Sequence, residues 1–277
     1  MILPPLDSKT YRRLSKFQKA CRIPADLAEQ LALGADPNQL FDFNYLERPL
    51  ASAINAAQPE SIHLLLAAGA DPNLPIRGRA PVALALGQAH QGEPQRLCVI
   101  AILDSPRLIC DSNDPLLATA VFCPELVAPL ARRGFNPNAI GSSGKSSCLG
   151  EAIGRQQAPS LSYLRAMLAA GALPEGLPGF YSPLARCLTS DSPTVQPQSQ
   201  SLCVIIKALL SAGADPRFIN PCGRSCVEIA EARAREFPAS VHPEIIEAIR
   251  ARALCLAEKD ELEGSTAQGS ANQRQFL

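Results

Sequence analysis

A five-residue string, Gly-Ala-Asp-Pro-Asn, follows an apolar helix-like run at residues 34–38 and returns after another such run at residues 69–73. In a broken copy at residues 104–107, Ser105 stands in place of the glycine. The copies recur about every 36 residues, a period typical of stacked repeats. A single repeat cannot bury its own apolar face, so this period predicts a solenoid in which neighbours stack. Degenerate copies occur at residues 134–138, 171–175 and 213–217.

The chemistry of the string predicts a helix end followed by a tight turn. Gly69 follows the apolar run Leu64–Ala68 and can cap a helix in the left-handed conformation, because it has no Cβ. Asp71 favours a turn through side-chain bonds to the backbone, and Pro72 does so through its fixed φ. We therefore expect the chain to leave each helix, turn sharply and run outward.

The residues after each turn predict the start of a new helix. A small or polar N-cap residue is followed by proline at the first helical position, where the missing N–H costs nothing. A second helix in each unit then shows apolar residues at i, i+3 and i+4, as in Ile62, Leu65 and Leu66. Each unit is thus predicted to be two helices and a turn. The helix starts lie at residues 48–53, 80–85 and 182–187, with looser versions at 147–152 and 225–230.

This combination resembles the ankyrin repeat family, whose unit is a β-turn and two antiparallel helices with a T-P-L-H-x-A start. The resemblance covers roughly residues 24–256. It implies an all-α solenoid of six full units, preceded by an N-terminal half unit that ends at Gly34. We expect N-terminal capping helices over residues 1–34, the repeat solenoid over 35–257 and a polar, disordered tail over 258–277.

Two places depart from the repeat pattern. The unit between Ser105 and Gly134 is short and carries Pro129, which is expected to kink its second helix and to permit a bend in the solenoid. Another unit holds a polar insertion over residues 189–201 with two prolines, which predicts an exposed loop between its helices.

Composition argues against several function classes. The 26 basic and 26 acidic residues cancel, so no global field favours nucleic acid. No apolar stretch is long enough to span a membrane, and residues 1–21 lack a signal-peptide hydrophobic region. We expect a cytoplasmic protein that is monomeric when unbound; export by a specialised secretion system stays open.

The sequence shows no arrangement typical of catalysis or of metal binding. Ten cysteines are scattered, only Cys222 and Cys226 are close together, and the three histidines lie far apart, so we expect reduced thiols and neither metal nor cofactor. The Gly-Ser-Ser-Gly-Lys-Ser string at residues 141–146 has the wrong spacing for a phosphate loop. The chain is therefore predicted not to be an enzyme, although an unrecognised catalytic site remains an alternative.

The family resemblance implies that a protein partner docks on the outward turns, or fingers, and on the exposed side of the first helices. Aromatic and arginine side chains dominate interface hot spots, so those in the finger segments are candidates. The alternative for each ring is that it folds back over the core. The candidate partner-binding residues are Phe41, Phe43, Tyr45, Arg77, Arg79, Phe135, Phe180, Tyr181, Arg217, Phe218 and Arg224.

The N-terminus allows a second functional hypothesis. It is locally basic, with six lysines and arginines over residues 9–22, which indicates either the solvated face of a capping helix or a binding patch. Residues 3–6 with Leu14, Ser15 and residues 20–22 are similar to the later part of an F-box, which would imply an effector or adaptor that links a target to a host ubiquitin ligase. The favoured hypothesis is a non-catalytic binding module that acts as an inhibitor, an immunity-type protein or an adaptor.

Overall fold

The structure is a computed structural model of the 277-residue chain, and it describes residues 8–41, 47–154, 160–189, 200–236 and 242–274. Within these ranges all regular elements are helices, and extended pairing is limited to isolated β-bridges. The chain divides into two compact units. The division falls in the short repeat that the sequence marks as irregular. Unit 1 comprises residues 1–112 and 122–135, and unit 2 comprises residues 113–121 and 136–277.

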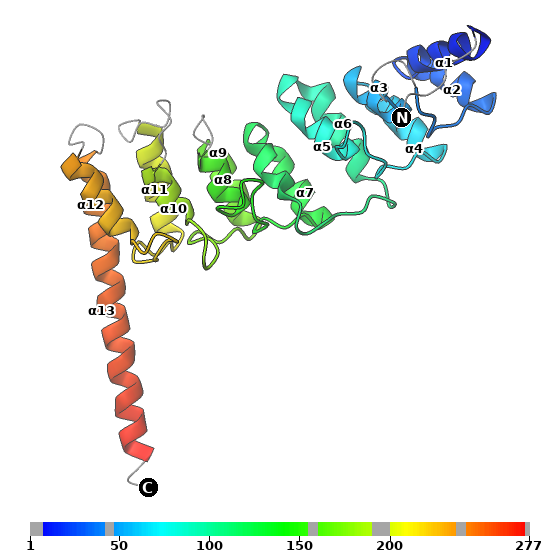
Figure 1. Cartoon of the computed structure of the whole chain (residues 1–277). Coiled ribbons are helices and arrows are strands. Elements are labelled where there is room, and N and C mark those ends of the chain that lie inside the picture. The colour runs from blue at the N-terminus through cyan, green and yellow to red at the C-terminus, as the bar shows by residue number, and fades with distance from the viewer. Residues whose placement is uncertain (1–7, 42–46, 155–159, 190–199, 237–241, 275–277) are drawn as a thin grey trace. The chain divides into compact units, whose positions relative to one another are not determined.

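Unit 1 consists of successive helix pairs (Figure 1). The second helices form one layer, in which α2 packs against α4 and α4 against α6, while α3 packs against α5 in the other. A short 3-10 helix, η1 (Ala89–Gln91), follows α5, and another, η3 (Pro124–Leu126), precedes α7. The α-helices are α1 (Ser8–Ala20), α2 (Pro24–Ala32), α3 (Pro49–Asn55), α4 (Pro59–Ala67), α5 (Pro81–Gln88), α6 (Glu93–Leu103) and α7 (Val127–Arg133).

Unit 2 repeats the same two-layer plan. The first helices α8, α10 and α12 pack in sequence, and the second helices α9, α11 and α13 form the layer behind them. Unit 1 holds two complete pairs after α1 and α2, and unit 2 holds three. With the irregular repeat that contains α7, six repeats follow α1 and α2 in the described chain, as the repeat count predicts. The α-helices are α8 (Cys148–Gly154), α9 (Leu161–Ala169), α10 (Pro183–Thr189), α11 (Gln200–Ser211), α12 (Cys226–Glu236) and α13 (Pro243–Arg274).

The repeated string ends helices as its chemistry predicts. Gly69 has a φ of 104°, and the glycines at 34, 134, 171 and 213 also lie in the left-handed region. The next residue closes the cap through a backbone bond to the residue five positions earlier, as from the Ala70 nitrogen to the Leu65 oxygen at 2.8 Å. In the turn, the Asp71 carboxylate accepts the Asn73 N–H at 2.9 Å. These bonds direct the chain away from the helix and into the finger.

The predicted helix starts are also present. Pro49, Pro81 and Pro183 are the first residues of their helices. At the start of α12, the Ser225 hydroxyl accepts the Glu228 N–H at 3.2 Å, and the Glu228 carboxylate accepts the Ser225 N–H at 2.7 Å. This reciprocal capping box fixes where α12 begins.

The irregular repeat differs from its neighbours in its first helix and corrects one expectation about its second. Its first helix is a 3-10 helix, η2 (Pro115–Phe122), almost all of which belongs to unit 2. The expected kink at Pro129 was wrong: Pro129 is the third residue of α7, within the first turn, where a backbone N–H has no helical partner to lose. Ser105 does end α6, with its N–H bonded to the Ile102 oxygen, but two extra residues then separate it from the rest of the turn.

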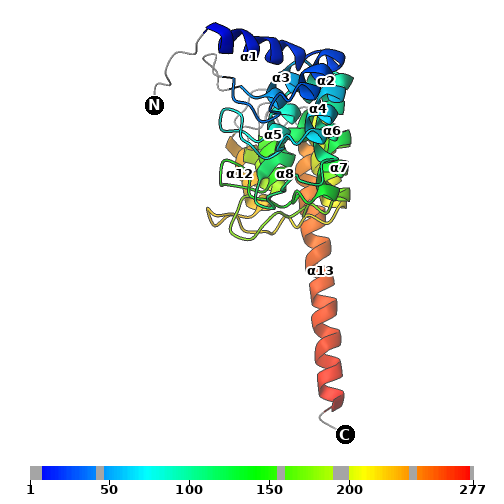
Figure 2. The ribbon, with the colours of Figure 1, turned by 90° about the vertical axis from the view of Figure 1, so that its right-hand side faces the viewer.

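The C-terminal boundary expected at residue 258 is not a boundary of the structure. Figure 2 shows α13 as one uninterrupted helix, and it runs through Arg274. Two ion pairs lie along the first part of this continuation: Lys259 pairs with Glu263 one turn later at 3.6 Å, and Asp260 pairs with Arg217 at 2.7 Å. Residues 190–199 of the predicted insertion lie outside the described residues; α10 and α11 flank them as expected.

Candidate partner-binding surface

Three fingers of unit 2 form one continuous surface with the helices behind them. We define the finger surface of unit 2 as loops 139–147, 176–182 and 217–225 with the exposed sides of α8, α10 and α12. The Tyr181 N–H donates to the Lys145 oxygen at 3.0 Å, in a β-bridge that joins the first two loops. The Tyr181 hydroxyl then lies 2.9 Å from the Cys222 sulfur of the third. Backbone and side chain together hold the three loops in register.

A ladder of asparagine side chains sets the spacing of neighbouring turns. In unit 2, Asn138 donates through Nδ2 to the Gly171 oxygen and accepts the Leu173 N–H through Oδ1, both at 2.8 Å. In unit 1, Asn38 makes the same two bonds to the Gly69 oxygen (3.1 Å) and the Asp71 nitrogen (2.7 Å). The last residue of the string therefore connects one repeat to the next.

Two further positions at the end of the string, Asn73 and Arg217, show where the register changes. Asn73 bonds to the Arg107 oxygen and the Ile109 nitrogen, both at 2.8 Å. Arg107 therefore accepts the bond that Gly69 and Gly171 accept in the other turns, although it lies two residues beyond Ser105. In the last string Arg217 replaces asparagine, and its guanidinium bonds to Asp215 (2.9 Å) and to Asp260 of α13 (2.7 Å). The helix α13 thus takes the place of a further repeat.

Two of the candidate aromatics are core residues, so their assignment to a partner was wrong. Phe41 is 1% exposed, and its ring packs edge-on against Phe17 of the capping helix α1 with 5.5 Å between centroids. Phe135 is 3% exposed. It occupies the alanine position of the string, where Ala70 and Ala214 are also buried. The alignment of Phe135 with these alanines could have indicated its burial from the sequence. The residues around Phe41 gave no such indication that α1 covers it.

The remaining candidates divide by exposure. Arg77 and Arg79 are exposed at the tip of a unit 1 finger, whose tight turn places Arg77 at a φ of 51°. Phe43 and Tyr45 lie outside the described residues. In unit 2, Arg224 is exposed and the other candidates are half-buried: Phe180, Tyr181, Arg217 and Phe218. The finger surface of unit 2 therefore unites aromatic and arginine side chains.

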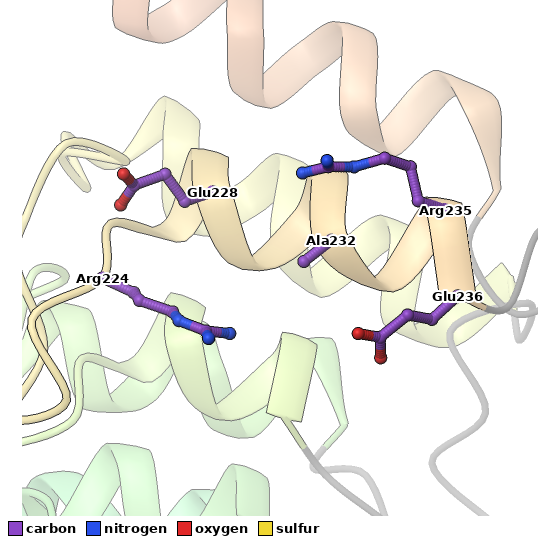
Figure 3. Close-up of a pocket in the computed structure, with 5 residues that line it drawn as sticks. All are labelled: Arg224, Glu228, Ala232, Arg235 and Glu236. Atoms are coloured by element: carbon purple, nitrogen blue, oxygen red, sulfur yellow. The ribbon is translucent and has the colours of Figure 1, made fainter.

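A pocket of about 400 Å³ lies beside α12 at the edge of this surface (Figure 3). Only Arg224 was a candidate from the sequence. The other lining residues lie at helical spacing along the exposed face of α12. The same spacing in the sequence could have placed them on one face of that helix. The pocket is lined by Arg224, Glu228, Ala232, Arg235 and Glu236.

The phosphate-loop-like string at residues 141–146 belongs to a finger, and its hydrogen-bond donors bind a carboxylate of the protein itself. The Glu151 side chain of α8 accepts the Ser143 N–H at 2.9 Å and the Ser142 hydroxyl at 2.5 Å. Glu151 is 7% exposed, so its negative charge is buried against the loop. The donors that a phosphate would use are occupied, which agrees with the spacing argument.

The cysteines of the core behave as apolar side chains. Burial raises the pKa of Cys21 to about 12 and those of Cys98 and Cys226 to about 11, so these thiols are neutral at physiological pH. The two cysteines that are close in sequence separate: Cys226 is buried at the start of α12, whereas Cys222 is exposed in the finger. Among the described helices, none is long and apolar enough to cross a membrane.

Comparisons with known proteins support the fold. No protein-family model matches the sequence, and no curated protein matches it. The ankyrin repeat domain of Bcl-3, a member of the IkappaB protein family, aligns with a TM-score of 0.65 and 22% identity over 85% of this chain and 97% of that one. The human ASB11 ankyrin repeat domain aligns with a TM-score of 0.55 and 18% identity over 85% and 96%. The chain has the ankyrin repeat fold.

Proposed function

We propose that this chain is a non-catalytic binding module that holds one partner protein on the finger surface of unit 2. The observation that carries the proposal is that Tyr181 bonds to both neighbouring fingers. These bonds hold the three fingers in place before a partner binds, with half-buried rings and exposed arginines on their surface. Preformed surfaces lose little conformational entropy on binding. Half-buried aromatics and arginines are also the residues that contribute most to interface affinity.

The specific role that we propose is occlusion or recruitment of that partner, as an inhibitor, an immunity-type protein or an adaptor. The repeats account for nearly all of the described residues, so binding itself is the activity to be explained. Action in the cytoplasm, with or without delivery through a specialised secretion system, belongs to the same proposal. Cell fractionation tests the location.

The packing of α1 argues against the F-box version of the adaptor role. Leu14 and Phe17 are 5% and 3% exposed, because α1 packs against α2 and α3 as a capping helix. Residues 3–6 of the similarity lie outside the described residues. A cullin adaptor recovered by the natural chain, and lost when Leu3 and Pro4 become alanine, would revive that version.

Affinity capture with quantitative mass spectrometry tests the proposed surface. We expect the natural chain to recover a partner that a Tyr181→Ala/Arg224→Ala variant loses. The matched control is Arg165→Ala, which removes an exposed arginine from α9 in the other helix layer and should leave recovery unchanged. Far-UV circular dichroism establishes that each variant is folded.

The opposite pattern would place the interface elsewhere. If the Tyr181→Ala/Arg224→Ala variant keeps the partner and Arg77→Ala/Arg79→Ala loses it, the finger of unit 1 is the binding surface. If Arg165→Ala loses the partner as well, recovery depends on charge in general and the finger surface of unit 2 has no special role.

A further inference from the structure

Three carboxylates on or beside the finger surface of unit 2 are engaged within the fold, whereas Glu236 of α12 forms no ion pair among the described residues. Glu151 is held by Ser142 and Ser143, and Asp215 forms an ion pair with Arg217 at 2.9 Å. Glu228 accepts both the N–H and the hydroxyl of Ser225 in the capping box, which lowers its pKa. These groups therefore already have hydrogen-bond partners within the protein.

Apart from Arg217, which pairs with Asp215 and Asp260, three cations of the same surface lack such counterparts among the described residues. Lys145 and Arg224 are exposed on the fingers, and Arg235 donates through Nε only to a backbone oxygen, that of Glu231, at 3.3 Å. Within the part of the chain that the structure describes, none of these three forms an ion pair with a carboxylate. The surface thus carries three cations outside any ion pair of the described chain, against one such carboxylate, that of Glu236.

A fourth cation, Arg186 of α10, lies against the neighbouring helix α8. A Cβ atom added at Gly154 would lie 1.9 Å from the Arg186 Nη2 atom, and one added at Gly150 would lie 3.6 Å from its Cγ atom. The two glycines leave the space that the arginine occupies. Arg186 is half-buried there and pairs with no carboxylate among the described residues.

The pocket beside α12 combines two of these cations with room for a side chain. Figure 3 shows Arg224 and Arg235 on two sides of Ala232, whose small methyl group leaves the floor open. Two carboxylates line the same pocket. Glu228 is held by Ser225, but the Glu236 carboxylate lies on the same side of α12 as the Arg224 guanidinium in this view. An incoming carboxylate would compete with Glu236 for Arg224.

We propose that the finger surface of unit 2 binds an acidic segment of the partner protein, with one carboxylate seated in the pocket between Arg224 and Arg235. This inference rests on the proposed function and adds the chemistry of the partner. Arginine favours carboxylates because its planar fork can donate two parallel hydrogen bonds. A peptide fits better than a nucleic acid, because the 26 basic and 26 acidic residues of the chain cancel, whereas a backbone with a charge at every phosphate favours a protein of net positive charge.

Fluorescence anisotropy on the full chain provides the direct test. The probes are a dodecapeptide of alternating Glu and Ala and the same peptide with Gln in place of Glu, both carrying an uncharged dye. We expect binding of the Glu peptide alone, weakening as salt is added, since screening reduces attraction between exposed charges. Equal binding of the Gln peptide would overturn the proposal.

Charge-matched variants locate the site. Arg224→Gln and Arg235→Gln should each weaken binding of the Glu peptide about tenfold or more, the usual effect of losing a hydrogen bond to a charged group. Glu236→Gln should tighten it several-fold, because the competing carboxylate is removed. Arg165→Gln, with the same loss of charge on α9, should leave it unchanged.

Three results would overturn the inference. One is an equal loss of binding in Arg165→Gln, which would indicate general charge attraction. Another is tighter binding of an oligothymidylate than of the Glu peptide, which would favour a nucleic acid. The third is a captured partner whose recovery is insensitive to salt and to Arg235→Gln; in that case the proposed function stands and only the acidic chemistry fails.

Discussion

Replacing Phe41 with alanine tests whether this ring supports the core or contacts a partner. The ring is 1% exposed, and it meets Phe17 edge-on with an interplanar angle of 79°. Truncation leaves a cavity beneath α1, and a buried Phe→Ala change typically lowers the free energy of unfolding by about 3–5 kcal/mol. About 0.5–1.5 kcal/mol of this is expected from the aromatic pair itself.

Urea unfolding followed by far-UV circular dichroism measures the loss. Amide hydrogen exchange then locates it, since stability in a stacked repeat protein depends on neighbouring contacts and α1 should exchange fastest. A double-mutant cycle with Phe17→Leu and Phe41→Leu isolates the coupling between the rings. Phe180→Ala is the control, and this half-buried finger ring should cost about 1 kcal/mol or less.

A contrary result is easy to recognise. If Phe41→Ala lowers the free energy of unfolding by less than about 1 kcal/mol and abolishes partner capture, the ring is a contact residue.

Three further predictions concern the repeat framework. Asn138→Ala should lower the free energy of unfolding by about 1–2 kcal/mol, because two exposed hydrogen bonds to the next turn are lost, and urea titration measures it. Gly69→Ala should destabilise by about 1–2 kcal/mol because its φ is 104°, whereas the helical Gly87→Ala, which meets no atom within 4 Å, should be neutral or stabilising in the same titration. The ion pair with Arg217 lowers the pKa of Asp215 below its ordinary 3.8, so its contribution is complete above that pH and is lost as pH falls through the folded-state pKa. Asp215→Asn should therefore unfold with a shallower pH dependence below about pH 4; an unchanged acid transition would show that the pair contributes nothing.

Sequence reasoning recovered the repeat framework because its causes are local. A left-handed glycine, a turn carboxylate and a proline at the first helical position act on residues one to three places away, so the string at residues 69–73 specifies its own helix end and turn. The count of repeats followed from the same signals. The helical continuation of α13 past residue 258 was not predicted, because polar composition at residues 258–263 does not reveal a distant partner such as Arg217.

The candidate site was only partly predictable. Arg224 was a candidate because of its place on a finger, but Arg235 and Glu236 were missed because finger membership says nothing of the far end of α12. The two-residue shift after Ser105 was also hidden, since it is defined by Asn73 in the preceding repeat. Each of these features depends on residues brought together by stacking.

The sequence by itself determined that this chain is a solenoid of helix pairs, where the helices of the regular repeats begin and end, and which turns become fingers. These properties depend on backbone conformation and on bonds between near neighbours. Only the tertiary structure decided which rings are covered, as Phe41 is and Tyr181 is not, and which cations lack a carboxylate partner. Burial and charge pairing are set by residues from other repeats, and their placement exists only after the repeats have stacked.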